Sequence, residues 1–328
     1  MKKLKNLFVA LALCAPLTVA AQDIVINEEN FPDENFRNYL LEQDYGADGV
    51  ITEAEIAGIT RFAITNKSIA SLKGIEHFTA LTRLSCSNNQ LVTLDVTNNT
   101  ALTELSCNTN QLTALDVSNN KALTSLWCQS NRLTTLDVSN NTALTTLYCN
   151  GNQLTALDLS NNKALTDLAC NGNQLTTLDV SNNKALTSLN CSSNPLTALD
   201  VSNNTVLTSL DCHRNQIKGE SMDALVSSLP ETPHGELYVY SGNPYDYEGN
   251  VITKSQVAAA KAKGWTSYYT SNGWEWQEYE GSDDEATRIA LLEIENGRAA
   301  VYTLDGQKVT TPQKGGIYIV NGKKIVVK

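Results

Sequence analysis

The feature of this sequence that most constrains its fold is a cysteine at every twenty-first residue. The series has seven members, at Cys86, Cys107, Cys128, Cys149, Cys170, Cys191 and Cys212. A fixed period of this length is typical of a solenoid, in which each repeat forms one coil that stacks on its neighbours. We therefore expect the repeat itself to determine the fold.

One repeat, aligned on Cys107, reads LTELSCNTNQLTALDVSNNKA. It matches the leucine-rich repeat pattern L-x-x-L-x-L-x-x-N-x-L, with cysteine in the third apolar place. We expect Leu105, Ser106 and Cys107 to form a short parallel strand that sends Leu105 and Cys107 inward and Ser106 to a concave face. Because one coil cannot bury its own leucines, stability should come from stacking, at about 1.5 to 3 kcal/mol for each buried side chain. The predicted fold class is an α/β leucine-rich repeat solenoid.

The pattern divides the 328-residue chain into six parts. Residues 1–21 join Lys2, Lys3 and Lys5 to a short apolar run, which is typical of a signal peptide. A helical cap at 22–58 precedes one 22-residue and seven 21-residue units at 59–217. An α/β cap at 218–280, an acidic linker at 281–286 and a β-rich module at 287–328 complete the chain.

Charge and hydropathy exclude several classes of partner. Without the signal peptide the chain has 21 basic and 35 acidic residues, a formal charge of −14, which disfavours binding to nucleic acids and anionic membranes. No apolar run is long enough to span a bilayer. Proteins, neutral glycans and cationic groups stay open as partners, and we expect a monomer that is secreted or held at the bacterial cell surface.

Two polar columns repeat together with the cysteines. A buried asparagine amide can bond to the backbone of the adjoining coil. Aspartates stacked about 5 Å apart would repel by about 1 kcal/mol in water, so turns in which each carboxylate accepts N–H bonds are expected, with a cation-binding ladder as the alternative. The asparagines interpreted as structural are Asn89, Asn110, Asn131, Asn152, Asn173, Asn194 and Asn215, and the aspartates are Asp95, Asp116, Asp137, Asp158, Asp179 and Asp200.

The cysteine column has three interpretations. Export routes favour disulfides, but an odd number of thiols at identical sites cannot pair fully, and bridging would turn the side chains out of the core. Zinc needs a tetrahedral site, whereas one cysteine per coil produces a line. We therefore interpret these cysteines as small, buried, weakly polar core residues.

On these residues the chain resembles a known family. The unit L-x-x-L-x-C-x-x-N-x-L-x-x-L-D-V-S-x-N-x-x is similar to the cysteine-ladder repeats of the internalin group of bacterial leucine-rich repeat proteins, and SIASLKGIEHFTAL resembles their 22-residue units. The resemblance implies a curved surface protein whose concave face binds a ligand on a host or neighbouring cell. It does not identify that ligand.

The segment before the repeats is predicted to be helix, loop, helix. Its loop places Asp44, Asp48, Val50, Thr52 and Glu55 at positions 1, 5, 7, 9 and 12 of an EF-hand-like pattern, while Gly46 at position 3 lacks a ligand oxygen. The family resemblance implies a cap that is derived from a truncated EF-hand and covers the first coil. Calcium is the candidate ion, and no other cofactor is expected.

The chain beyond Ile217 loses the period. ESMDALVSSLP is predicted to be a helix, ELYVY a strand, and TKSQVAAAKAKGW a helix closed by Gly264. Later aromatic residues are predicted to form a lid on the last coil rather than a ligand site. They are Tyr268, Tyr269, Trp274, Trp276 and Tyr279.

The C-terminal 287–328 segment contains three hairpin turn signals between alternating apolar runs, at Asn296-Gly297, Asp305-Gly306 and Asn321-Gly322. We expect a small antiparallel β module. VYTLDGQKV and GGIYIVNGKKIVVK resemble the C-terminal sorting domains that bacterial type IX secretion recognises. That resemblance implies export across the outer membrane, and a residual β cap is the alternative.

No catalytic constellation stands out, so we expect no enzyme. Information about a partner should lie where the repeats differ. Trp127 and Tyr148 precede cysteines on adjacent strands and should point outward, either as anchors for a ligand or as a cross-strand pair that stiffens the sheet. The other candidate binding residues are Glu104, Gln129, Asn150, Asp167, His213 and Arg214.

We expect an exported, non-enzymatic protein that recognises or adheres to a protein or glycan through its concave face. One alternative is a structural or assembly component of the cell surface in which the solenoid is a spacer. Another is a calcium-stabilised accessory module.

Overall fold

The computed structural model describes residues 23–242, 248–271 and 275–282, and the strand residues 301–302, 308–309, 317–320 and 323–326. The predicted signal peptide at 1–21 and most of the predicted linker at 281–286 lie outside the described residues. Within them, no helix is long and apolar enough to cross a membrane.

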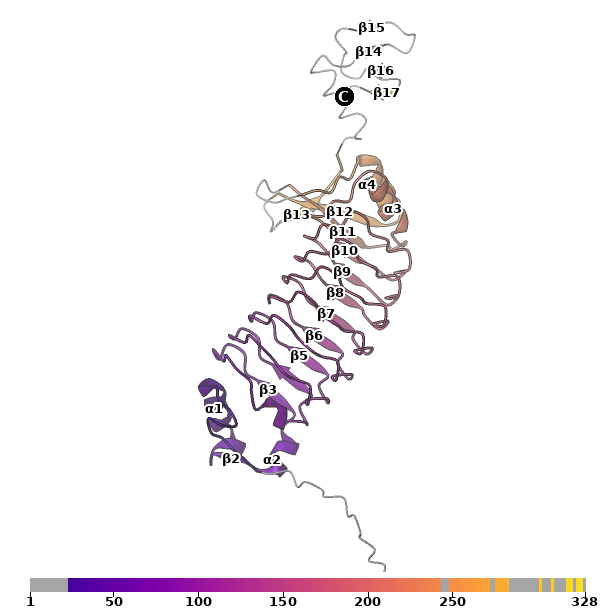
Figure 1. The fold of residues 1–328 in the computed structure, drawn as a ribbon. Helices are drawn as coiled ribbons and strands as arrows, with labels where there is room; N and C mark the ends of the chain where they lie inside the picture. The colour runs from indigo at the N-terminus through magenta and orange to yellow at the C-terminus, as the bar shows by residue number, and fades with distance from the viewer. Residues whose placement is uncertain are drawn as a thin grey trace, which may run out of the picture.

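The repeats fold into a solenoid whose strands belong to one eleven-stranded sheet, ordered from β3 at one edge to β13 at the other. The coil strands are β3 (Arg61–Ala63), β4 (Arg83–Ser85), β5 (Glu104–Ser106), β6 (Ser125–Trp127), β7 (Thr146–Tyr148), β8 (Asp167–Ala169), β9 (Ser188–Asn190) and β10 (Ser209–Asp211). They pair in parallel with equivalent residues opposite one another. Because the coils stack in chain order (Figure 1), each repeat position becomes a column along the molecule.

The apolar positions of the repeat fill the core. In β6, Leu126 is buried and Trp127 faces outward, and Cys128 just after the strand is fully buried. This alternation confirms the predicted inward and outward positions, although the aligned strand begins at Glu104 rather than Leu105. All seven cysteines of the column are free and buried, and burial raises the pKa of the Cys86 thiol to about 12.

Asparagine side chains join each coil to the one before it. Asn131 donates from Nδ2 to the carbonyl oxygens of Cys107 and Cys128, at 3.1 and 3.0 Å. Its Oδ1 accepts from the N–H of Leu112. Asn250 makes the equivalent bonds to Cys212, Val239 and Ile217, so the C-terminal cap continues this column.

A second asparagine column was not predicted. Asn141 is fully buried and donates from Nδ2 to the carbonyl oxygens of Val117 and Asn120, at 3.0 and 2.9 Å. A threonine column adds bonds along the strand edge, as when the Thr124 hydroxyl donates to the Thr103 carbonyl. The buried asparagines of this second column are Asn99, Asn120, Asn141, Asn162, Asn183 and Asn204.

The aspartate column lies in turns of the predicted kind. Oδ1 of Asp116 accepts from the N–H of Ser118 at 2.9 Å. Hydrogen bonds from the side chain and backbone of Ser118 lower the pKa of Asp116, and they outweigh the desolvation and the repulsion from Asp137 that raise it. Local hydrogen bonding therefore offsets the repulsion between stacked carboxylates.

The N-terminal cap consists of β1 (Ile24–Val25) paired with β2 (Val50–Ile51), helices α1 (Glu34–Leu41) and α2 (Glu53–Gly58), and the 3₁₀ helix η1 (Asp44–Gly46). A second 3₁₀ helix, η2 (Ile75–His77), lies in the first coil. The rings of Phe36 and Phe62 pack with centroids 6.0 Å apart, and those of Phe31 and Phe78 lie 6.1 Å apart. All four rings are fully buried, so the cap covers the apolar end of the solenoid.

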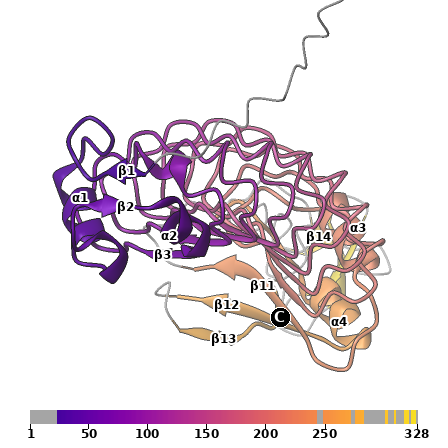
Figure 2. The same cartoon turned by 90° about the horizontal axis from the view of Figure 1, so that it is seen from below.

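The C-terminal cap contains α3 (Glu220–Ser228), β11 (Gly235–Ser241), α4 (Lys254–Ala262), β12 (Trp265–Thr270) and β13 (Trp276–Glu278). Strands β11 and β12 extend the sheet in parallel, and β13 closes its edge in antiparallel orientation (Figure 2). Gly264 has a φ of +85°, and a Cβ there would approach the Thr232 oxygen to 1.6 Å, which explains why glycine ends the predicted helix. The predicted apolar face of α3 is buried at Met222, Leu225, Val226 and Leu229.

The C-terminal module forms the predicted antiparallel sheet, with strand order β15-β14-β16-β17. Its strands are β14 (Val301–Tyr302), β15 (Lys308–Val309), β16 (Ile317–Val320) and β17 (Lys323–Val326). The three predicted turn dipeptides lie outside the described residues.

Candidate recognition surface

The outward side of β3 to β10, called the strand face below, carries the residues that differ between coils. Each strand exposes its first and third residues there, and the register aligns them in two rows. The first row is Arg61, Arg83, Glu104, Ser125, Thr146, Asp167, Ser188 and Ser209. The second row is Ala63, Ser85, Ser106, Trp127, Tyr148, Ala169, Asn190 and Asp211.

Trp127 and Tyr148 lie opposite each other on β6 and β7, and both are partly exposed. The aromatic contacts between described residues lie in the N-terminal cap, in the first coil and around β11 to β13, and none of them joins these two rings. A pair that stiffened the sheet would place one ring against the other. Both rings therefore keep apolar surface that no aromatic neighbour covers.

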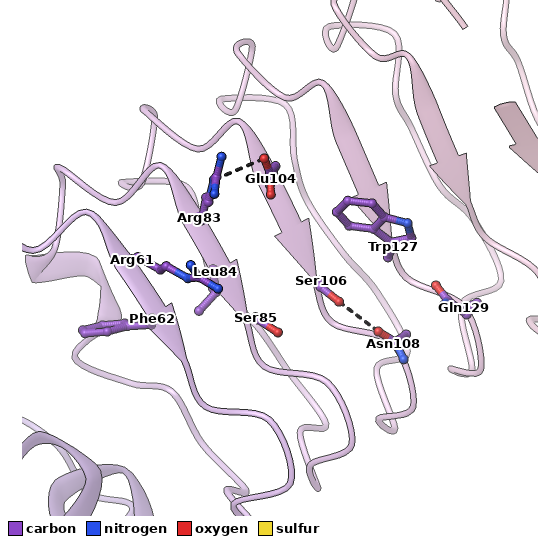
Figure 3. Close-up of a pocket in the computed structure, with 10 residues that line it drawn as sticks. All are labelled: Arg61, Phe62, Arg83, Leu84, Ser85, Glu104, Ser106, Asn108, Trp127 and Gln129. Atoms are coloured by element: carbon purple, nitrogen blue, oxygen red, sulfur yellow. Dashed lines mark hydrogen bonds and ion pairs between the residues drawn. The ribbon is translucent and has the colours of Figure 1, made fainter. Parts of the chain in front are cut away.

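Trp127 forms one wall of a hollow of about 390 Å³ on the strand face (Figure 3). The hollow spans the outward sides of β3 to β6. The predicted residues Glu104 and Gln129 also line it. Its full lining is Arg61, Phe62, Arg83, Leu84, Ser85, Glu104, Ser106, Asn108, Trp127 and Gln129.

Two arginines make this end of the strand face basic. Arg61 and Arg83 lie directly opposite each other on β3 and β4. Arg83 Nε lies 3.2 Å from Glu104 Oε1, whereas Arg61 makes no side-chain hydrogen bond or ion pair within the described chain. Like charges opposite each other on adjacent strands destabilise a sheet, so the fold alone does not account for this pair.

Some polar groups that line the hollow are hydrogen-bonded to one another, and others have no good hydrogen-bond partner in the part of the chain that the structure describes. The Ser106 hydroxyl donates to Asn108 Oδ1 at 2.9 Å, and the Ser87 hydroxyl donates to the same oxygen. Asn108 Nδ2 makes one long contact within the described residues, 3.4 Å to Thr109 Oγ1. Gln129 Oε1 is shielded from solvent and has no donor within the described chain. The hollow thus offers the Asn108 amide as a donor to a ligand, whereas Gln129 Oε1 becomes reachable only if its side chain turns.

The remaining predicted binding residues do not line this hollow. Tyr148, Asn150 and Asp167 belong to the next coils along the strand face. Strands β7, β8 and β9 separate the hollow from β10, which precedes His213 and Arg214. The structure therefore does not bring these last two residues to the aromatic pair.

His213 is engaged at the other end of the sheet. Its Nδ1 lies 2.5 Å from Asp211 Oδ1, and its ring packs against Trp276 with centroids 5.1 Å apart. Trp276 in turn contacts Tyr238, which stacks on Tyr268. Tyr238 lies opposite the outward residue Asp211, and Tyr268 lies opposite Tyr238, so these two rings continue the outward row of the sheet. The lid on the last coil stays a prediction, and Trp274 of the predicted cluster lies outside the described residues.

The candidate calcium residues of the cap are committed to other contacts. Glu55 Oε2 accepts from the N–H and the hydroxyl of Thr52 at 2.8 Å, which forms a capping box at the start of α2, and Asp48 Oδ1 accepts from the Val50 N–H. Gly46 is buried, and a Cβ there would approach the Leu40 oxygen to 2.1 Å, so no ligand side chain fits at loop position 3. Asp44 begins η1, and no three acidic, histidine or cysteine side chains of the described residues gather as a metal site. As arranged, these residues do not fit a calcium ion.

Calcium binding stays a prediction, and melting curves recorded with calcium and with EDTA test it. A higher melting temperature with calcium would support it.

Comparisons with known proteins agree with this architecture. No protein-family model matches the chain. A 70-residue stretch, 21% of the chain, is 46% identical to internalin J of Listeria monocytogenes serotype 4b and covers 8% of that protein. The solenoid consists of internalin-like leucine-rich repeats.

Two solved structures extend the comparison. The functional domain of internalin J, which includes a cysteine ladder, aligns with 82% of this chain and 65% of that domain, at 28% identity and a TM-score of 0.45. Internalin C2 of Listeria monocytogenes aligns with 61% of this chain and 92% of its own, at 24% identity and a TM-score of 0.54, and this similarity supports the leucine-rich repeat fold. The stretch of this chain that matches internalin J covers 8% of the length of that protein.

The prediction of binding residues missed Arg61 and Arg83. Both occupy the first strand position, which also contains the predicted Glu104 and Asp167. Reading that position back through the first two coils would have found them. The repeat pattern is weakest there, because the first coil has 22 residues and phenylalanine in place of the strand leucine.

Proposed function

We propose that this chain is an exported, non-enzymatic protein that mediates recognition or adhesion at a bacterial cell surface through its strand face. The observation that carries the proposal is the pair of partly exposed residues Trp127 and Tyr148, which lie opposite each other on adjacent strands without a ring–ring interaction between them. Aromatic residues on a rigid sheet provide large contact area at little entropic cost and are enriched among binding hot spots. The internalin-like repeats support a binding role at a surface.

The ligand class and the export route are also part of the proposal. A protein or a glycan on a host or neighbouring cell would contact the aromatic pair and the polar residues beside it. The predicted signal peptide and the sorting-like C-terminal module support export, with type IX secretion as the proposed route. Fusion of residues 287–328 to a periplasmic reporter, in a host with and without that system, tests the route.

Binding to protein and glycan arrays tests the strand face. We expect Trp127→Ala with Tyr148→Ala to lose most of the binding that the parent protein shows, by tenfold or more. The matched control is Val92→Ala with Val206→Ala, because these two exposed apolar residues, at 51% and 49% exposure, lie outside the strands. Unchanged binding in the aromatic variant would overturn the proposal, and binding that disappears on deletion of residues 285–328 instead would favour a spacer role for the solenoid.

A further inference from the structure

The hollow between β3 and β6 differs in charge from the rest of the strand face. It contains two arginines and one glutamate, in a chain whose expected mature charge is −14. Further along the strand face the charged residues are Asp167 and Asp211, which are acidic. A cationic hollow on an acidic protein favours an anionic group at that point and disfavours it elsewhere on the same face.

The arginines suit a carboxylate. Arg61 is exposed and unpaired within the described chain, and Arg83 shares its guanidinium with Glu104 on the outer side of the hollow. Arginine recognises carboxylates through paired N–H donors, and such charge-assisted bonds are about twice as strong as neutral ones. One guanidinium is thus available outright, and the second can exchange Glu104 for a ligand carboxylate.

The other walls suit a hydroxylated ring. The indole of Trp127 provides an apolar face, and Figure 3 shows it at the side of the hollow opposite Arg61 and Arg83. Asn108 Nδ2 provides a donor whose one protein contact within the described residues is 3.4 Å long, to Thr109 Oγ1. The apolar floor residues Phe62 and Leu84 are almost fully buried, so no deep apolar pocket exists here for a large side chain of a protein ligand.

We infer that this hollow binds a carboxylated saccharide, with the carboxylate on Arg61 and Arg83, the sugar ring against Trp127, and a hydroxyl group on Asn108. The inference rests on the proposed function, and it names the ligand class. An acidic peptide would also use the arginines, so a peptide probe is included in the test to distinguish the two ligand classes.

Calorimetry with defined probes tests the inference on the full mature chain. The probes are 3′-sialyllactose, trigalacturonic acid and a hyaluronan hexasaccharide, each compared with its carboxyl-reduced form, and a hexaglutamate peptide. We expect at least one saccharide acid to bind at least tenfold more tightly than its reduced form. Arg61→Gln should weaken that binding about tenfold, whereas Arg132→Gln, which removes an exposed positive charge outside the hollow, should change it less than twofold.

Glu104→Gln provides a test in which binding of the saccharide acid should become tighter rather than weaker. The substitution removes the anion that competes for Arg83, so the saccharide acid should bind several-fold more tightly while its reduced form does not. The inference is overturned if no acid binds, if acid and reduced forms bind equally, or if hexaglutamate alone binds with dependence on Arg61. If these probes fail while another array ligand still requires Trp127 and Tyr148, the proposed function stands and the inference fails.

Discussion

Asn131 satisfies three buried backbone groups with one side chain. Its amide bonds the carbonyl oxygens of Cys107 and Cys128 and the N–H of Leu112. Asn131→Ala leaves these groups unpaired, so the free energy of unfolding should fall by about 2 to 4 kcal/mol. Asn119→Ala is the control, since Asn119 is exposed and its single 3.2 Å bond to Thr97 should be worth less than about 0.5 kcal/mol. Urea denaturation measures both, and equal losses would contradict this account.

Cys128 tests the interpretation of the cysteines as core residues. Burial is the largest cause that raises its thiol pKa, and the neighbouring thiols Cys149 and Cys107 add to it. Because the thiolate is the reactive form, iodoacetamide should label the column in urea and leave it almost unlabelled under native conditions at pH 8. Cys128→Ser should lower the free energy of unfolding by about 1 to 3 kcal/mol, because it buries a hydroxyl without a partner. Rapid native labelling would show that the coils open locally.

The aspartate turns give the solenoid a predictable response to acid. Hydrogen bonds lower the folded-state pKa of Asp95, Asp116, Asp137, Asp158 and Asp179 below the unfolded value of about 3.9. Their stabilisation is therefore present above about pH 4 and is lost as the pH falls through the folded-state values. Urea midpoints should drop between about pH 5 and pH 3, and they should drop less in Ser118→Ala with Ser139→Ala, which lack the hydroxyl donors. Identical pH profiles for the two proteins would contradict the role of these turns.

At the scale of elements, periodicity predicts the coils and the strand alternation because both depend on which positions are apolar. It cannot separate two adjacent asparagines, since Asn119 is exposed and Asn120 is fully buried although both follow the same serine. Only the stacking of complete coils decides which amide faces the neighbouring carbonyls. The hollow was missed for a related reason: Arg61 and Trp127 line it from strands β3 and β6, and no local pattern joins residues so far apart in the chain.

At the scale of the whole molecule, the columns make neighbouring coils interchangeable while the ends are specialised. The asparagine and cysteine columns run through every regular coil, and Asn250 continues the asparagine bonds into the C-terminal cap. Phe31 and Phe36 close the other end. Recognition residues can therefore change on the strand face without disturbing the bonds that hold the coils together.

Removing one complete coil tests whether the recognition residues on the strand face are independent of the bonds that hold the coils together. Deletion of residues 171–191 joins Cys170 to Ser192 and restores the repeat, so every column continues and both caps keep their partners. We expect this variant to unfold in a single transition, at a lower urea midpoint because one coil interface is lost. Deletion of residues 171–188 removes three residues fewer but shifts the register, which leaves buried asparagines and leucines without their columns, so it should aggregate or lose its cooperative transition. If both deletion variants fold equally well, stacking of neighbouring coils does not depend on aligned columns. If the deletion of 171–191 abolishes binding at the distant hollow, the strand face is not independent of the number of coils.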